Sequence, residues 1–343
     1  MNVFHLRKVA VRTWILEATS GRLYFDQASV RIIMGTWDTS LYSGDFAMDL
    51  RATIGAVVRL PFDADRLVDV LCETEPVAAN DPRDEDHTTF WLVVADQFAK
   101  RGIAADRVRD TALAIIDAGD DIAMLARRGM TPADIRKRRK MLDAIRARVV
   151  APTVEKRRAV LAKPQPLLMA VGDVIAVPTC AGRCINAYYP SKAHDTQYTK
   201  DGPRPWEQDG WAAAVIIDCG RAFEFLSWYR PVVIVEARAE KPTLDALVSD
   251  LRWRLELAGT CSPSHFKKME LEIIGRLPVD RAKVDAVFPR LRPGISAAVS
   301  DISIANRLSA SPAGHAPPIR GSGEAAKGRA QHFDGLQAIL EDR

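Results

Sequence analysis

The sequence has few cysteines, and they form no pattern. Five cysteines are an odd number scattered over 343 residues, which excludes the paired disulfide framework of small secreted proteins. No apolar run approaches the roughly 18 residues that a membrane-spanning helix needs. Arg12 and Glu17 interrupt the apolar stretch near the N-terminus, which is untypical of a signal peptide. We therefore expect a cytoplasmic protein without a membrane partner.

Familiar catalytic motifs are absent as well. The sequence contains no G-x-S-x-G, no H-E-x-x-H and no paired C-x-x-C, the patterns of serine hydrolases, zinc proteases and zinc-binding modules. We therefore predict no catalytic residue and no cofactor, and we favour a protein that is not an enzyme.

The excess of positive over negative charge is concentrated in one stretch of the chain. The net charge is +4, but residues 127–163 hold 13 Lys or Arg against three acids, so a polyanion would bind there. No aromatic residue between Ile135 and Arg158 could stack on a base, which favours a solvated helix face over nucleic-acid binding. The candidate basic patch is Arg136, Lys137, Arg138, Arg139 and Lys140, with Lys156, Arg157 and Arg158 in the linker.

The hydrophobic pattern changes from helical to strand-like along the chain. Its length suits two domains. We expect an α+β protein in which an all-α N-terminal domain is joined by a basic helix and linker to a β-rich C-terminal domain with one or two helices. The expected segments are an upstream extension (1–33, or a hairpin), a helical domain (34–150, with Met34 as the natural start), a linker (151–168), a β-rich domain (169–308) and a disordered tail (309–343) with a short helix from Phe333 to Leu340.

Local signals predict where several helices begin and end. Asp45 can cap the first helix, and after a polar loop at 73–86 the acidic run Asp84 to Asp86 favours the start of another. Gly119 should end a helix over Asp106 to Ala118, and Thr131 followed by Pro132 should begin the next.

Strand patterns dominate the C-terminal part. Leu247, Leu251 and Leu255 also predict a helix from Thr243 to about Leu257. Strands are expected at 171–177, 184–189, 212–218, 223–228, 232–239 and 269–274.

Three groups of residues could carry chemistry. Cys180, Cys184, Cys261 and His265 could supply four zinc ligands, although small buried thiols explain the cysteines better. Asp218 with Glu236 and Arg238 resembles a metal-dependent nuclease layout, but arginine replaces the usual lysine, so a surface ion pair is favoured. Asp84 to Asp86 with His87 could act in acid–base chemistry, and helix capping explains them better.

An aromatic block, residues 223–230 (FEFLSWYR), follows Asp218 and ends with Arg230. Trp, Tyr and Arg are frequent binding hot spots when exposed, and the aromatic side chains are core residues when buried. Core placement is favoured for most of them. The candidate binding residues are Phe225, Trp228, Tyr229, Arg230 and Asp218.

Two family resemblances suggest a function. The segment MGTWDTSLYSGDFAMDLRATI, with FWLVVADQFAKRGI, ALAIIDAGDDIAML and KRRKMLDAIRA, resembles the bacterial domain-of-unknown-function family 4259 over residues 34–150. The C-terminal part, from VGDVIAVPTCAGRCINAYY through WAAAVIIDCGRAFEFLSWYRPVVI, resembles the immunity-protein-26 family. That resemblance implies a toxin-neutralising protein that works by stoichiometric binding, and neither family brings catalytic residues.

Three functions are therefore open. The first is an immunity-type protein whose partner is a protein, such as a toxin, and which presents an exposed aromatic patch near Trp228. The second is a metal-dependent phosphodiesterase, which requires Asp218 and Glu236 to converge. The third is a nucleic-acid-associated adaptor that uses the basic connector.

Overall fold

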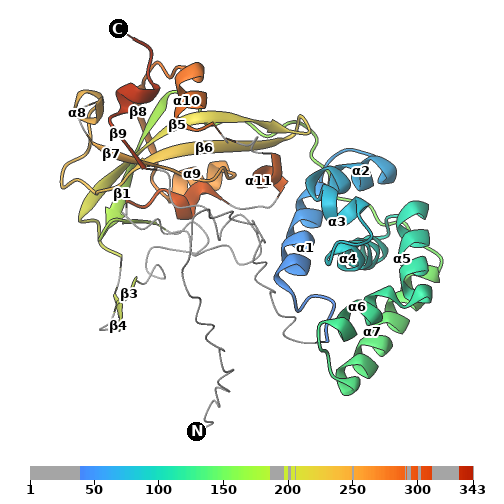
Figure 1. The fold of residues 1–343 in the computed structure, drawn as a ribbon. Helices are drawn as coiled ribbons and strands as arrows, with labels where there is room; N and C mark the ends of the chain where they lie inside the picture. Colours follow the sequence, from blue (N-terminus) through green and yellow to red (C-terminus); the bar gives the residue numbers. More distant parts are fainter. Residues whose placement is uncertain are drawn as a thin grey trace, which may run out of the picture. The chain divides into compact units, whose positions relative to one another are not determined.

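The computed structural model describes residues 39–185, 197–199, 202–204, 206–248, 251–289, 291, 295–299, 303–310 and 332–342. By its contacts the chain divides into Met1–Ile33 and Met34–Arg343, and the predicted extension and start at Met34 lie outside the described residues. Helices occupy residues 45–150, here called the helical half, and an antiparallel sheet lies within residues 173–334, in what is here called the sheet half (Figure 1). The α+β class is thus confirmed.

The helical half packs around one buried helix, α4. Its side chains from Phe90 to Phe98 are all buried, and it contacts α1, α3, α5 and α7. The helices are α1 (Asp45–Val57), α2 (Ala64–Thr74), α3 (Pro76–Asn80), α4 (His87–Arg101), α5 (Asp106–Ala118), α6 (Asp120–Arg127) and α7 (Pro132–Val150).

The predicted helix ends are partly correct. Gly119 ends α5 in the left-handed conformation with φ 73°, and the Thr131 hydroxyl accepts a hydrogen bond from Asp134 N at 3.2 Å. The capping role predicted for Asp45 is wrong, because Gly44 precedes the helix and Asp45 is its first residue. The loop predicted at 73–86 contains the end of α2 and all of α3.

The sheet half is built on a seven-stranded antiparallel sheet. The strand order is β2-β1-β5-β6-β7-β9, and β8 pairs with β1. Two further strands, β3 and β4, form a separate pair. The strands are β1 (Asp173–Cys180), β2 (Arg183–Cys184), β3 (Gln197–Thr199), β4 (Gly202–Arg204), β5 (Gly210–Ala222), β6 (Leu226–Ile234), β7 (Arg252–Leu255), β8 (Glu272–Arg276) and β9 (His332–Asp334).

Short helices connect the strands. The prediction of one or two is wrong, since the described part of the sheet half holds four short α-helices and two 3₁₀ turns. They are α8 (Leu244–Val248), α9 (Pro263–Lys268), α10 (Arg281–Val287), α11 (Ile295–Val299), η2 (Ile304–Arg307) and η3 (Leu336–Ile339). None of the described helices is both long and apolar enough to cross a membrane.

Three predicted elements of the sheet half differ from the structure. The helix expected from Thr243 to Leu257 is only α8, because residues 252–255 pair with β6 as strand β7. The strands expected at 223–228 and 232–239 are one strand, β6, which is buried along its whole length and includes Pro231. Phe223 and Glu224 have positive φ and lie in the turn of the β5–β6 hairpin.

The predicted disorder of the tail is wrong at residues 309–310, which are buried. Of the short helix expected from Phe333 to Leu340, the structure has the 3₁₀ turn η3, with Leu336 and Ile339 fully buried, while residues 332–334 form strand β9 and pair with β7. These side chains belong to the core of the sheet half, so burial of apolar surface holds the segment. Residues 311–331 lie outside the described part.

The linker is packed against both halves. Arg158 Nη1 donates to Val58 O at 3.1 Å, and Leu161 N donates to Arg59 O at 2.7 Å. Gln165 N donates to Phe225 O at 2.9 Å, at the tip of the β5–β6 hairpin. The residues at this tip join the apolar cluster of the helical half; they are Ala222, Leu226 and Trp228, with Phe223 and Phe225 packed against it.

Candidate functional site

The predicted aromatic patch is largely buried. Trp228 is 7% exposed and Tyr229 is fully buried, and Arg230 is 7% exposed. The Tyr229 hydroxyl accepts a hydrogen bond from Leu168 N at 2.7 Å, which ties strand β6 to the linker. Phe225 is half-buried. The prediction of core residues is confirmed for Trp228 and Tyr229, and that of an exposed patch around Trp228 is wrong.

Asp218 and Glu236 do not converge. Asp218 lies opposite Arg230 in the β5–β6 pair, and its carboxylate forms an ion pair with Arg281 at 3.3 Å. Glu236 lies beyond the end of β6, between Val233, which pairs with Ala214, and Arg238, which pairs with Trp211. Ala214 and Trp211 lie four and seven residues from Asp218 along β5, about 13 and 23 Å at roughly 3.3 Å per residue. Arg238, the third residue of the proposed nuclease layout, pairs with Trp211 through its backbone. The nuclease arrangement is therefore wrong.

The candidate zinc ligands make other contacts. Cys184 Sγ lies 3.2 Å from Ser309 Oγ, and His265 Nδ1 lies 3.2 Å from Ser303 Oγ. Burial raises the pKa of Cys261 to about 12, which keeps its thiol protonated. Cys180 is partly buried. Within the described residues, no three His, Cys, Asp or Glu side chains gather as metal ligands would.

The acidic run before α4 makes structural contacts. His87 Nδ1 lies 2.8 Å from Ala78 O, and Glu85 forms an ion pair with Arg128 at 2.9 Å. Asp84 Oδ1 accepts a hydrogen bond from Asp86 N at 2.9 Å. These contacts fix the turn that leads into α4, although no side chain of the run caps the helix.

The basic stretch is not a uniform solvated face. Arg138 is 4% exposed and forms an ion pair at 2.8 Å with the fully buried Asp121. Lys156 Nζ donates to Lys100 O at 3.0 Å. The predicted patch is therefore wrong for Arg138. Its exposed members are Arg136, Lys137, Arg139 and Lys140, of which Lys137 pairs with Asp134 at 3.0 Å.

Beside Glu75, acidic side chains crowd one another. Burial, and then the negative charges of Asp86 and Asp49, raise the pKa of Glu75 to about 7. A folded-state pKa above the unfolded value means that the folded protein binds the proton more tightly. The contribution of protonated Glu75 to the free energy of unfolding is therefore fully present below about pH 4.5 and is lost as the pH rises towards 7.

Glu75→Gln should therefore stabilise the protein above pH 7, by about 2 kcal/mol after allowance for partial solvent exposure, with little effect near pH 4.5. Urea unfolding at both pH values measures the difference. Glu73→Gln is the matched control, because Glu73 is exposed on the same stretch of chain. An equal gain in the control, or a gain that is independent of pH, would contradict the prediction.

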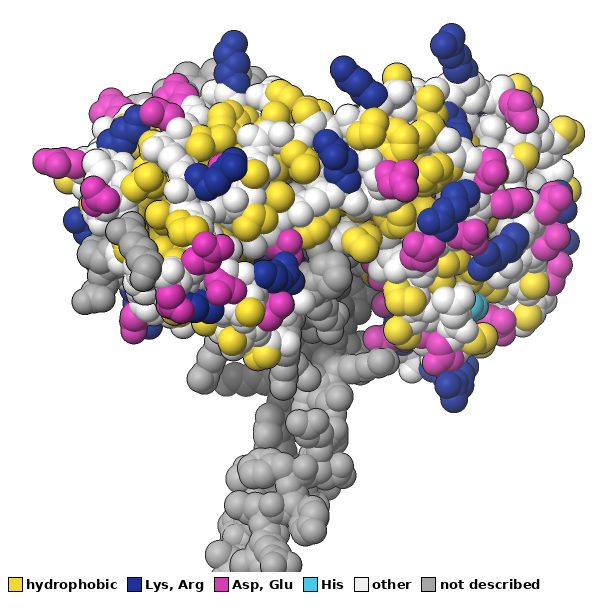
Figure 2. Space-filling model, turned by 90° about the horizontal axis from the view of Figure 1, so that it is seen from above, with side chains coloured by type: hydrophobic (Ala, Val, Ile, Leu, Met, Phe, Trp, Pro, Cys, Tyr) yellow, Lys and Arg dark blue, Asp and Glu magenta, His cyan; other side chains and the backbone are white. Residues whose placement is uncertain are grey.

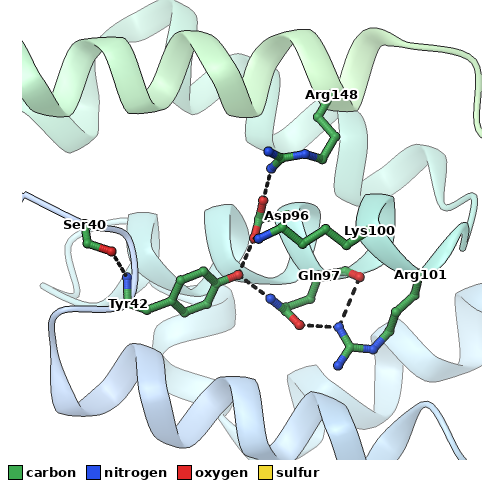
Figure 3. A network of polar contacts seen from close by, with 7 residues as sticks. All are labelled: Ser40, Tyr42, Asp96, Gln97, Lys100, Arg101 and Arg148. Carbon is green, nitrogen blue, oxygen red and sulfur yellow. Dashed lines mark hydrogen bonds and ion pairs between the residues drawn. The ribbon is translucent and has the colours of Figure 1, made fainter.

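A network of polar side chains enters the core of the helical half (Figure 3). Tyr42, in the turn before α1, donates its hydroxyl hydrogen to the Asp96 carboxylate, and Gln97 donates to the Tyr42 oxygen. Asp96 and Gln97 lie on α4 and are 2% and 4% exposed. Because buried polar groups are costly without partners, these contacts hold Tyr42 and α4 in fixed relative positions.

Two cations bind the same carboxylate. Lys100 Nζ, one helical turn further along α4, lies 2.6 Å from Asp96 Oδ2, and Arg148 of α7 pairs with Oδ1. The side chains of Lys100 and Arg148 remain 46% and 39% exposed. The buried acid thus fixes two cations that also face solvent.

Two more cations lie beside this pair. Arg101 donates to the Gln97 side chain, and Arg51 of α1 has its Cζ 5.2 Å from the Tyr42 ring centroid. Lys100 Nζ lies 5.4 Å from the same centroid. We call these four residues, Arg51, Lys100, Arg101 and Arg148, the cationic surface.

The network suits binding better than proton transfer. Burial, followed by the hydrogen bond to Asp96, raises the pKa of Tyr42 above its usual range, so the phenol stays neutral at physiological pH. The negative charge of Asp96 acts on Lys100, Arg148 and Arg101. On the face shown in Figure 2, charged side chains of both signs are interspersed among apolar atoms. In the cationic surface the acid Asp96 forms ion pairs with two of the four cations, Lys100 and Arg148.

Sequence reasoning did not identify this site. The one available signal was Asp96-Gln97 in the middle of FWLVVADQF, where a helix that is apolar on several faces carries two adjacent polar residues. Their partners at 42 and 148 are more than fifty positions away, and helical spacing says nothing about such contacts.

Comparison of the chain with models of known protein families, with curated proteins and with solved structures finds no match. The two family resemblances therefore stay predictions, and the function is argued from the chain's own residues.

Proposed function

We propose that the protein is a non-enzymatic binding protein of the immunity, toxin-neutralising type, which acts by stoichiometric association with a protein partner. The observation that carries this proposal is the cationic surface. Three of its four residues are arginines, a residue type that is enriched among binding hot spots. The four residues lie on three helices, α1, α4 and α7, which hold them in defined positions. The resemblance of the C-terminal part to an immunity family supports the same class of function.

Fixed cations favour association because little side-chain entropy is lost when a partner binds. Arg148 and Lys100 are held by the buried Asp96, and Arg101 is held by Gln97. The aromatic block contributes indirectly, because Trp228 lies in the apolar cluster of the helical half and supports it.

Affinity capture from the native host tests the proposal. The full chain should retain a protein at one-to-one stoichiometry, identified by mass spectrometry, and Arg51→Glu should retain at least several-fold less of it. The control is Arg139→Glu, the same charge change at an exposed position of α7. Recovery of no protein in stoichiometric amount with the wild-type chain would contradict the proposed function.

A further inference from the structure

The cationic surface also indicates what its partner looks like. We propose that it binds a carboxylate-rich protein segment, that is, a stretch of Asp and Glu side chains; this inference rests on the proposed function.

The charge balance leaves an excess of cations. Arg51 is exposed and Arg101 is half-buried, and they are close enough that burial, together with the positive charge of Arg51, lowers the pKa of Arg101. Asp49, an acidic residue on α1, interacts with Asp45 and Glu75. A negative partner would relieve the repulsion among the cations, and like charges on a partner would be rejected.

The aromatic ring of the site favours carboxylates over nucleic acid. Proteins that hold single strands combine basic residues with aromatic faces on which bases stack. The Tyr42 ring is half-buried and already contacts Arg51 and Lys100, while its hydroxyl is bonded to Asp96. Guanidinium groups, in contrast, match the two oxygens of a carboxylate in bidentate geometry.

The experiment measures binding of the full chain to a fluorescent ten-residue oligoglutamate peptide. Arg51→Glu should weaken binding about tenfold, and added salt should weaken the wild-type complex steeply. Arg51 suits this test because it is exposed and approaches the network with its Cζ 5.2 Å from the Tyr42 ring centroid. Urea unfolding of the variant confirms that stability is retained.

Arg139→Glu is the matched control, since it changes the net charge equally on α7, nine residues from Arg148. It should bind the peptide within about twofold of wild type. An equal loss in both variants would overturn the proposal, because net charge alone would then explain binding. Tighter binding of a single-stranded oligonucleotide of equal charge, lost in Arg51→Glu, would overturn it in favour of nucleic acid.

The two proposals fail in different ways. If oligoglutamate binds at Arg51 but the host yields no stoichiometric protein, the surface stands and the immunity-type function falls. If a host protein is retained by wild type and by Arg51→Glu alike, while oligoglutamate does not bind, the function stands and the carboxylate-binding surface falls.

Discussion

Replacing Asp121 by alanine is expected to lower the free energy of unfolding by about 3–5 kcal/mol, because it leaves the Arg138 guanidinium as an unpaired buried charge. Asp121 is fully buried and accepts from Arg138 Nε at 2.9 Å and Nη2 at 2.8 Å. Arg138 also donates to Ser40 O at 3.0 Å, in the turn before α1. Urea unfolding followed by circular dichroism measures the loss.

Two variants make this test specific. Asp120→Ala changes the exposed neighbour in the same helix turn and should cost less than about 0.5 kcal/mol. The double variant Asp121→Ala with Arg138→Met removes the unpaired charge and should recover more than half of the loss. Equal costs for Asp120→Ala and Asp121→Ala would contradict the role of the buried pair.

Replacing Trp228 by alanine is expected to lower the free energy of unfolding by about 3–5 kcal/mol, because it opens a cavity in the apolar cluster of the helical half. The indole is packed over Gly220 of the paired strand, where an added Cβ would lie 3.1 Å from Trp228 Cζ2. A binding patch on the surface would give the opposite result, with lost binding and unchanged stability.

Phe225→Ala provides the comparison. Phe225 is half-buried, with its ring centroid 6.2 Å from that of Phe62 in an edge-to-face pair. Its removal should cost less than that of Trp228, on the order of 1–2 kcal/mol. Chemical denaturation of both variants gives the order, and a larger loss for Phe225→Ala would show that the hairpin tip is not packed as described.

Local signals predicted the helical half well where the chain itself supplies them. Helix α5 has the predicted bounds, because a left-handed glycine ends it and its apolar residues repeat at helical spacing. Helix α3 was missed because it lies inside the polar stretch 73–86 that was predicted as a loop, and α2 was missed because its start was not recognised. Asp63, whose side chain accepts from Arg66 N at 2.8 Å, was the overlooked start signal of α2.

The sheet half shows where local pattern fails. Leu247, Leu251 and Leu255 satisfy helical spacing, yet Trp253 is fully buried in a strand that pairs with Ile234. Residues 252–255 form a strand because they pair with β6 and β9, and the spacing of apolar residues in the sequence does not predict such pairing. The same holds for β9, a strand of three residues with no alternating pattern of its own.

The candidate site was missed for a related reason. A run of basic residues reads as a solvated face, but the buried acid Asp121 draws Arg138 out of that face. The buried Asp96 pairs with a second arginine of α7, Arg148, which stays partly exposed. Which arginine is buried depends on how α7 packs against α4 and α6, and packing is a property of the folded chain.

The packing of the β5–β6 hairpin tip in the apolar cluster of the helical half has a consequence for local unfolding. A region opens on its own only when few apolar contacts tie it to its neighbours. Separation of the helical half from the β5–β6 tip would hydrate Leu226 and Trp228 together with the helix faces that they cover. Opening of either side therefore exposes apolar surface on the other, which makes the tip and the helices a single cooperative unit.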